Sequence, residues 1–380
     1  MKSVIFISLI FISSLIAECS DLDYTDCIYW STFCEWNDIS GQCQDIGGGT
    51  GGETDGPYEY ASISESDGLR NGPEYKDGVL YYPIGAPVPY KSIVFTPGWG
   101  SNGASMSSWA TFIASHGFIA MTLGPNDEIN DSHEMRGQGL IDGIETIIQE
   151  NSRISSPLYG MIDVNSYSVG GYSMGGGASQ NAAMMDSNIK AVISLNPTVI
   201  FDDCDLCPPE YYDGVIYCIC LVPEFVDHSV PSIIFAGEIE VNELSGYEGM
   251  LGQDIYANMP EDTEKIMFEG AGDGHGFAAY PYGEVQDYAL NWLKYHLLGD
   301  ASACESLLEH PSIASQYLTN IECNDSVIGD INGDSLVNIQ DIILTINYIL
   351  NSEYNILADI NSDNAVDILD IVQLVNLILD

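Results

Sequence analysis

The sequence predicts a central domain of the α/β class with a mostly parallel sheet, accompanied by two smaller modules. Short apolar runs alternate with longer segments of helical periodicity, and this alternation is typical of a parallel sheet covered by helices on both faces. The expected strands are 92–95, 118–123, 167–171, 191–195, 232–236 and 265–268, and the expected helices are 137–150, 174–185 and 282–298. Functional side chains are therefore expected at the carboxyl ends of the strands.

The first 17 residues predict a cleaved signal peptide. Lys2 precedes an apolar run that extends to Ile16, and the small Ala17 stands before Glu18. A lipid-modified Cys19 is the alternative, but Glu18 occupies the position where a lipoprotein signal requires a small residue. No other segment approaches about 18 uninterrupted apolar residues. We therefore expect a secreted, extracellular protein without membrane insertion, held at the cell surface only through a docking partner.

Ten cysteines fall into three groups of even size. Export favours disulfides within each group, although the Cys-x-x-Cys and Cys-x-Cys spacing of the middle group is also compatible with zinc. The pairing within the first two groups stays open. Residues 18–45 predict a Cys-rich mini-module too small for a core of its own, and the glycine-rich run 46–56 predicts a flexible linker. The groups are Cys19, Cys27, Cys34 and Cys43; Cys204, Cys207, Cys218 and Cys220; and Cys304 and Cys323.

The charge of the chain is strongly acidic. Nine Lys and Arg residues stand against 56 Asp and Glu residues, for a formal net charge of −47. A field of this sign repels phosphate backbones and anionic lipid, so nucleic acid is excluded as a partner. The acidity itself is explained by a soluble surface and requires no specific cationic partner.

The candidate nucleophile is Ser173. It lies in the segment Gly171-Tyr-Ser-Met-Gly-Gly176, which follows an expected strand and begins an expected helix. A G-x-S-x-G turn in this setting raises the serine hydroxyl above the edge of the sheet, because the turn is strained and tolerates only small neighbours. The alternative is a chance glycine-rich turn, and the flanking strand and helix argue against it.

A histidine base is expected after the serine in chain order. His275 fits best, because it lies in the glycine-rich loop Gly272-Asp-Gly-His-Gly276 between the last expected strand and the last long helix of the domain. His228 lies in a Cys-rich stretch, His296 within the helix, and His310 in a tail before a proline.

The acid that orients the base should follow the strand 232–236, where the candidates Glu238, Glu240 and Glu243 remain open. Any of them is also compatible with a solvated acidic surface. The oxyanion of an ester-hydrolysis intermediate requires two N–H donors. Met174, next after the nucleophile, offers one, and Trp99 in the loop Thr96-Pro-Gly-Trp-Gly100 offers the other.

The chain from about Gly56 to Cys323 resembles the bacterial cutinase and PET-hydrolase family, a branch of the α/β-hydrolases related to dienelactone hydrolases. The motifs that carry the resemblance are Gly56-Pro-Tyr, Gly78-Val-Leu-Tyr-Tyr-Pro, Thr96-Pro-Gly-Trp, Ala114-Ser-His-Gly-Phe, Ser156-Pro-Leu-Tyr-Gly, Gly171-Tyr-Ser-Met-Gly-Gly-Gly and Ala303-Cys-Glu, in this order.

The resemblance implies an α/β-hydrolase fold over residues 57–323 and a catalytic triad of Ser173, His275 and Glu240, with Glu where the family usually has Asp. It implies Trp99 at the oxyanion position, a disulfide from Cys304 to Cys323, an ester or polyester substrate and no cofactor for catalysis. Two departures bear on the substrate. Thr198 replaces an aromatic residue that flanks the substrate in the family, and a Cys-rich insertion covers about 202–227.

Residues 324–380 contain a repeat with a period of 29 residues, since the segment that starts at Gly329 returns at Ala358. Each copy places carboxylate or amide oxygens at positions 1, 3, 5, 9 and 12 of a loop, the pattern that binds Ca²⁺, with position 7 giving a main-chain carbonyl. An apolar segment of helical period follows each loop, at 342–350 and 371–379. A plain helical hairpin with acidic loops is the alternative, but it does not explain the repeated oxygens. The predicted ligands of the two Ca²⁺ sites are Asp330, Asn332, Asp334, Leu336, Asn338 and Asp341, then Asp359, Asn361, Asp363, Ala365, Asp367 and Asp370.

This repeat resembles a type I dockerin, a small all-α domain with Asp at loop position 12. The resemblance implies a cohesin-like protein partner. The usual glycine at position 6 is Ser335 in one loop and Asn364 in the other. We expect weaker binding in the first loop, because Ser tolerates the left-handed conformation less well than Asn.

The sequence thus predicts a secreted serine esterase with a docking module. One alternative is an acetyl or feruloyl esterase acting on polysaccharide. Another is a catalytically weak binding component of an extracellular assembly, because Glu replaces the family's usual acid.

Overall fold

The computed structural model describes residues 34–37, 42–45, 56–198, 226–323, 328–331, 336–351, 354–355, 357–361, 363 and 365–379. Contacts divide the chain into Met1–Thr54 and Asp55–Asp380. In the first unit, β1 (Cys34–Asn37) and β2 (Gln42–Asp45) form an antiparallel pair. The expected signal peptide, Cys19, Cys27 and almost all of the Cys-rich insertion lie outside the described residues.

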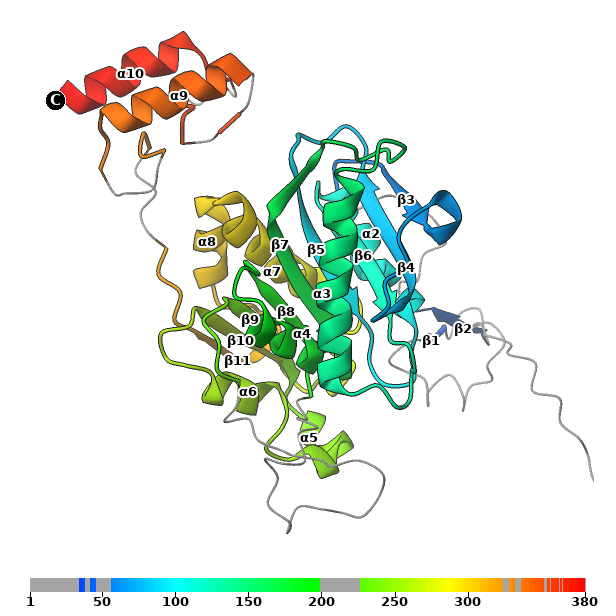
Figure 1. Ribbon diagram of the computed structural model, residues 1–380. Coiled ribbons are helices and arrows are strands. Elements are labelled where there is room, and N and C mark those ends of the chain that lie inside the picture. The colour runs from blue at the N-terminus through cyan, green and yellow to red at the C-terminus, as the bar shows by residue number, and fades with distance from the viewer. Residues whose placement is uncertain are drawn as a thin grey trace, which may run out of the picture. The chain divides into compact units, whose positions relative to one another are not determined.

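The second unit contains a nine-stranded sheet in the order β11-β10-β9-β8-β7-β5-β6-β4-β3 (Figure 1). The central strands from β10 to β6 are parallel, whereas β11 at one edge and β4 and β3 at the other are antiparallel. The strands are β3 (Tyr60–Ser64), β4 (Lys76–Pro83), β5 (Tyr90–Thr96), β6 (Ile119–Gly124), β7 (Ile162–Tyr172), β8 (Val192–Leu195), β9 (Ser232–Gly237), β10 (Lys265–Gly270) and β11 (Ala314–Thr319).

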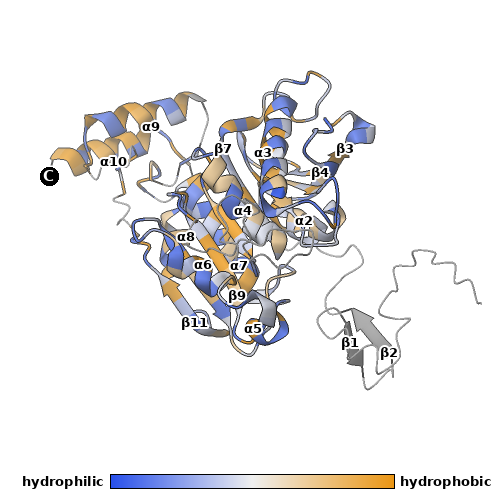
Figure 2. Cartoon of the chain, turned by 60° about the horizontal axis from the view of Figure 1, so that its bottom comes forward, coloured by the Kyte–Doolittle hydropathy of each residue, from blue (hydrophilic) through white to orange (hydrophobic). Residues whose placement is uncertain are grey.

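All six predicted strands are present, and they are the parallel ones. Their side chains are buried on both faces, which gives continuous apolar runs that are easily recognised in the sequence. The apolar character of β9 is visible in Figure 2. The three antiparallel strands are partly exposed and were not predicted: β3 and β11 lack such runs, and the apolar run 79–82 of β4 was not assigned to a strand.

Helices cover both faces of the sheet. The segments are α2 (Ser107–Ser115), α3 (His133–Glu150), α4 (Met174–Met185), α5 (Glu240–Glu243), α6 (Gly252–Asn258), α7 (Gly283–Leu293) and α8 (Ala301–Leu308), with the short turns η2 (Glu65–Asp67), η3 (Gly103–Met106), η6 (Ser245–Tyr247) and the π-helical η7 (Lys294–Leu298). The expected helix 282–298 is therefore divided into α7 and η7. Helix α3 begins four residues before its predicted start, because the Ser132 hydroxyl caps it by accepting from the Met135 N–H at 3.1 Å.

Alternate side chains of the strands belong to separate core clusters. Phe95 in β5 packs in a cluster with Trp109 of α2 and Trp292 of α7. Its neighbour Val94 belongs to a second cluster with Leu140 of α3. This alternation follows from the period of two along a strand. The α/β-hydrolase arrangement predicted from the sequence is confirmed.

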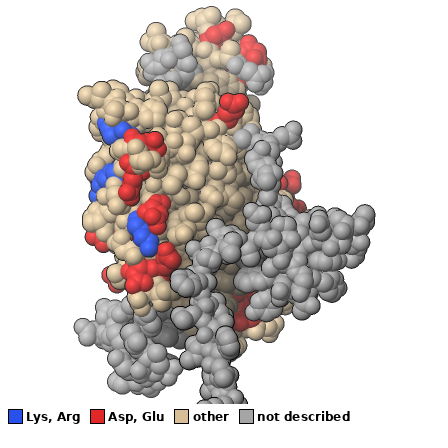
Figure 3. Space-filling view, turned by 90° about the vertical axis from the view of Figure 1, so that its right-hand side faces the viewer, with Lys and Arg blue, Asp and Glu red and all other residues tan. Residues whose placement is uncertain are grey.

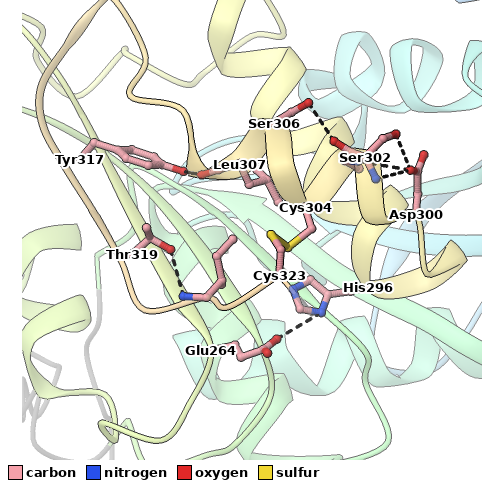
Figure 4. The surroundings of a disulfide bond; sticks show 12 residues. Glu264, His296, Asp300, Ser302, Cys304, Ser306, Leu307, Tyr317, Thr319 and Cys323 are labelled. Carbon is pink, nitrogen blue, oxygen red and sulfur yellow. Dashed lines mark hydrogen bonds and ion pairs between the residues drawn. A yellow bond between two sulfur atoms is a disulfide. The ribbon is translucent and has the colours of Figure 1, made fainter. Parts of the chain in front are cut away.

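A disulfide joins Cys304 in α8 to Cys323, which follows β11 (Figure 4). This is the bridge implied by the family resemblance. The Tyr317 hydroxyl in β11 also donates to the Leu307 carbonyl of α8. Because it joins residues separated by 19 positions, the disulfide stabilises the fold by about 3 kcal/mol, chiefly by lowering the conformational entropy of the unfolded chain. It fixes the end of the domain next to its edge strand.

Several of the few basic side chains form ion pairs with nearby carboxylates. Arg70 lies 2.6 Å from Asp142 and Lys76 lies 3.2 Å from Glu128. On the face shown in Figure 3, blue groups lie beside red ones. No basic patch is visible among the described residues on this face. No helix in the described part of the chain is long and apolar enough to cross a membrane.

The C-terminal repeat contains α9 (Ile339–Asn351) and α10 (Ile368–Leu379). Both helices begin three residues before the predicted apolar segments, so they include position 12 of each loop. Leu374 of α10 is fully buried, whereas Ile343, Leu350 and Leu377 are exposed. The predicted small all-α module is therefore observed.

Candidate active site

Ser173 lies at the turn between β7 and α4. Its backbone has φ 56° and ψ −118°, a conformation that is strained for a residue with a side chain. The surrounding glycines are required by close packing. A Cβ atom on Gly171 would lie 2.4 Å from the Gly175 carbonyl oxygen, and one on Gly175 would lie 2.2 Å from the Thr96 carbonyl oxygen. The serine is thus presented at the carboxyl end of the sheet, as predicted.

A hydrogen-bonded chain connects three of the predicted residues. Ser173 Oγ lies 2.8 Å from His275 Nε2, and His275 Nδ1 lies 2.5 Å from Glu240 Oε1. The histidine side chain is 20% exposed and the glutamate side chain is fully buried. This is the geometry in which an imidazole removes a proton from a serine while a carboxylate fixes its orientation.

The three candidate glutamates follow β9 and each contacts a different point of the histidine loop. Only Glu240, the first residue of α5, reaches the imidazole. Glu238 Oε2 accepts from the Gly272 N–H at 2.7 Å, and Glu243 Oε2 accepts from the His275 N–H at 2.6 Å. The sequence left these three open, because their distances to the ring depend on how the chain turns after the strand.

Asn196 is a site residue that the sequence analysis missed. Its Nδ2 donates to Glu240 Oε2 at 2.9 Å, and its Oδ1 accepts from the Ala278 N–H at 2.7 Å. The same Glu240 oxygen accepts from the Gly237 N–H at 2.9 Å. The sequence feature that could have identified Asn196 is its place as a polar residue directly after the buried strand β8. Asn196 and Gly237 hold the carboxylate so that its other oxygen faces the ring.

Of the two predicted oxyanion donors, Met174 directly follows the serine, and Trp99 directly follows Gly98, which lies close to it. Helix α4 begins at Met174, and the N–H groups of a first helical turn have no partner inside the helix. In the facing loop, a Cβ atom on Gly98 would lie 3.1 Å from Ser173 Cβ, so the two backbones approach closely. Trp99 is 63% exposed, and its Nε1 donates to the Ile129 carbonyl at 3.1 Å.

Arg136 of α3 is a second residue that the sequence analysis missed. It is 1% exposed and donates to the carbonyl oxygens of Pro97 (3.1 Å), Gly98 (3.3 Å), Glu128 (2.9 Å) and Asp131 (3.2 Å). Burial lowers the pKa of Arg136 to about 10, so the guanidinium stays charged at neutral pH. This cation fixes the main chain of the loop that carries Trp99.

The other candidate histidines have partners other than Ser173. Burial lowers the pKa of His228 to about 4 and that of His296 to about 3. His228 Nε2 lies 2.7 Å from Gln180 Oε1, and His310 Nδ1 lies 3.0 Å from the Pro311 carbonyl oxygen. Figure 4 shows His296 beside Glu264 near the disulfide, with 3.8 Å between Nδ1 and Oε2.

Thr198 occupies the position where the resemblance led us to look for an aromatic residue. It is 4% exposed, and its N–H donates to the Ser173 carbonyl at 3.1 Å. A Cβ atom on Gly177 would lie 1.9 Å from the Thr198 carbonyl oxygen. The threonine therefore packs against the start of α4 instead of presenting a flat ring.

The predicted calcium loops share a repeated hydrogen-bond pattern. Asp341 Oδ2 accepts from the Asn338 N–H and Asp370 Oδ2 from the Asp367 N–H, both at 2.8 Å, which joins positions 12 and 9 in each loop. Both position 12 side chains are fully buried. Asn332 and Asp334 lie outside the described residues, whereas the other predicted ligands lie within them: Asp330, Leu336, Asn338, Asp341, Asp359, Asn361, Asp363, Ala365, Asp367 and Asp370.

The residues present fit a hard cation. The repeat contains several buried carboxylates and no basic residue, since the last Lys or Arg of the chain is Lys294. The mutual repulsion of these carboxylates favours a bound Ca²⁺. Within the described residues no three His, Cys, Asp or Glu side chains converge as a metal site. The predicted set does not depend on carboxylates alone, because amide and main-chain oxygens complete it.

The fold and the Ser-His-Glu geometry define the class of a serine hydrolase with the α/β-hydrolase architecture. Comparison with known families agrees with this class. Residues 53–202 match the PET hydrolase-like family and residues 328–379 match the dockerin type I domain. The resemblances to the PET hydrolase-like family and to the type I dockerin are therefore both confirmed.

Relatives extend the match beyond the family segment. "Cutinase est2" of Thermobifida alba is 24% identical over 257 residues, covering 67% of this chain and 75% of the relative. "Cutinase 2" of Thermobifida cellulosilytica has the same identity and length, covering 86% of the relative. "Bis(hydroxyethyl) terephthalate hydrolase" of Streptomyces coelicolor is 23% identical over 240 residues, covering 63% of this chain and 67% of the relative. The predicted enzyme class, a carboxylic-ester hydrolase, is confirmed.

Proposed function

We propose that the protein is a secreted esterase that acts through Ser173, His275 and Glu240 and docks to a cohesin-type partner through its dockerin domain. The observation that carries the proposal is the chain of hydrogen bonds from Ser173 Oγ to the buried Glu240 carboxylate, at 2.8 and 2.5 Å. The proposed division of the chain is a signal peptide (1–17), a Cys-rich module (18–45), a linker (46–56), the catalytic domain (57–323) and the dockerin (324–380).

The proposed reaction starts when His275 Nε2 takes the proton of Ser173 as Oγ attacks the ester carbonyl carbon. The negative charge formed on the carbonyl oxygen is stabilised by the N–H groups of Met174 and Trp99. Collapse of this intermediate breaks the ester bond, and the imidazolium gives its proton to the leaving alkoxide. Water then attacks the acyl-enzyme with the same base, which releases the acid. No step requires a cofactor.

The substrate class proposed first is an apolar or polymeric ester. The cutinase relatives support it, and so does the exposed indole of Trp99 at the site. An acetyl or feruloyl esterase acting on polysaccharide is the second candidate. It is favoured by Thr198, which is buried where the family has a flat aromatic residue, and by the dockerin domain.

Calcium is the proposed ligand of the dockerin, with one ion in each loop. Asp330, Asn338 and Asp341 would hold the ion of the first loop, and Asp359 and Asp370 belong to the equivalent set in the second. Bound Ca²⁺ would neutralise these carboxylates and connect each loop to the helix that follows. The exposed apolar residues of α9 and α10 support a protein partner on these helices.

The test of the proposed enzyme uses a fluorophosphonate probe and a short chromogenic ester. We expect the probe to label Ser173, and Ser173→Ala to abolish both labelling and turnover. Ser245→Ala, at an exposed serine of the segment after α5, is the matched control and should leave both unchanged. Turnover retained in Ser173→Ala would refute the assignment and leave the chain as a binding component.

A further inference from the structure

His275 is held at its main chain as well as at its ring. Its N–H donates to Glu243 Oε2 at 2.6 Å, and its carbonyl accepts from the Tyr172 hydroxyl at 2.8 Å. Its ring nitrogens face Ser173 and Glu240. All four polar groups of this one residue therefore have defined partners, two of which take no part in the proton transfer.

The contact from Glu243 depends on a glycine. A Cβ atom on Gly274 would lie 2.2 Å from Glu243 Oε1 and 2.3 Å from both its Cδ and its Oε2. The carboxylate thus lies directly against the main chain of the residue before His275. A charged acceptor makes a shorter and stronger hydrogen bond to an N–H group than a neutral one does. This hydrogen bond therefore fixes the position of the His275 backbone nitrogen.

The contact from Tyr172 connects the base to the nucleophile. Tyr172 is the residue immediately before Ser173, so its hydroxyl joins the two catalytic segments directly. Its ring centroid lies 5.3 Å from that of His275. Burial, with a smaller effect from Glu240, raises the pKa of Tyr172 well above its usual value. The hydroxyl therefore keeps its proton at neutral pH and donates a hydrogen bond to the His275 carbonyl.

We propose that Glu243 and Tyr172 are positioning residues that fix the main chain of His275 and thereby the separation of Ser173 Oγ and His275 Nε2. This inference rests on the proposed triad and deepens it. Neither residue exchanges a proton with the substrate. Their effect arises because a displacement of about 1 Å between reacting groups can lower a rate on the order of a hundredfold.

If the contact between Glu243 and the His275 N–H served only the fold, breaking it would change stability and leave kcat unchanged. Glu243 is exposed, and the loss of an exposed side chain costs little stability. Gly274→Ala offers an independent way to break the same bond, because the new methyl group would occupy the position of the Glu243 carboxylate. If the two changes act on one contact, their effects on catalysis should not add.

The experiment measures kcat and KM on a short soluble ester for the full chain with calcium present. We expect Glu243→Ala, Gly274→Ala and the double variant each to lose on the order of tenfold in kcat, with KM within about twofold. Glu243→Gln should recover most of the loss, since an amide oxygen still accepts the hydrogen bond. Tyr172→Phe should also lose on the order of tenfold. Glu248→Ala, an exposed glutamate of the same segment, is the control and should match the parent.

The results separate this inference from the triad on which it rests. Normal kcat in Glu243→Ala, while Ser173→Ala is inactive, would refute the positioning role and leave the triad intact. Additive losses in the double variant would refute the shared contact. Activity in Ser173→Ala would refute the proposed function itself.

Discussion

The Glu240→Gln variant tests the proposed triad most directly, because the structure determines which way the new amide must face. Glu240 Oε2 accepts two hydrogen bonds, from Asn196 Nδ2 and the Gly237 N–H, both at 2.9 Å. In the variant the amide oxygen must take this place, since an NH₂ group there would face two donors. The NH₂ group then faces His275 Nδ1, which must become an acceptor. The proton of the neutral ring moves to Nε2, where it blocks removal of the Ser173 proton.

We expect kcat to fall on the order of a thousandfold or more, about 4 kcal/mol in activation free energy, because the imidazole has the wrong tautomer and its cationic form loses its carboxylate. The side chain is isosteric, so the fold should survive. Hydrolysis of a chromogenic acetyl ester gives kcat, and a thermal melt checks folding. Glu238→Gln is the control, because Glu238 contacts only the Gly272 N–H among these groups. Activity of Glu240→Gln within tenfold of the parent, with an intact fold, would refute the reasoning.

Three further outcomes are expected. Arg136→Met should lower kcat at least tenfold and cost about 3 kcal/mol of stability, because carbonyl oxygens that Arg136 binds lose their donor; an unchanged urea midpoint and unchanged kcat would contradict this. Acidification from pH 7 to pH 5 should lower the free energy of unfolding by about 2 kcal/mol through His228. The pKa of His228 is about 4 in the folded protein, below the usual value of about 6.5. In this pH range His228 therefore gains a proton only in the unfolded chain. In urea titrations with calcium present, His228→Gln should reduce the pH dependence by about this amount and leave the part contributed by His133 and His296, because burial also lowers the pKa of these two histidines to about 3. Chelation of calcium should hasten chymotrypsin cleavage after Tyr348 and Tyr354 without changing turnover of a soluble ester, and equal cleavage rates would refute ion-coupled folding.

The local signals in the sequence identified the elements with strong, short-range patterns. Buried parallel strands produce continuous apolar runs, so all six were predicted. The turn at Ser173 was predicted because its glycines are required by contacts between residues close in sequence, such as Gly171 with Gly175. The two calcium loops were predicted in the same way, since all ligands of a loop lie within 12 residues.

The glutamate that faces His275 could be identified only from the fold, because Glu238, Glu240 and Glu243 lie within six residues and differ only in how the chain turns after β9. The tertiary structure also revealed Asn196 and Arg136, each of which binds groups far away in the sequence. Arg136 binds the Pro97 carbonyl, 39 residues away, and Asn196 binds the Ala278 N–H, 82 residues away. The class of the fold, the candidate nucleophile and the duplicated loops could be predicted from the sequence, since their signals are local. The orientation of the acid and the support of the oxyanion loop were decided by packing between distant segments, which leaves no pattern in any one of them.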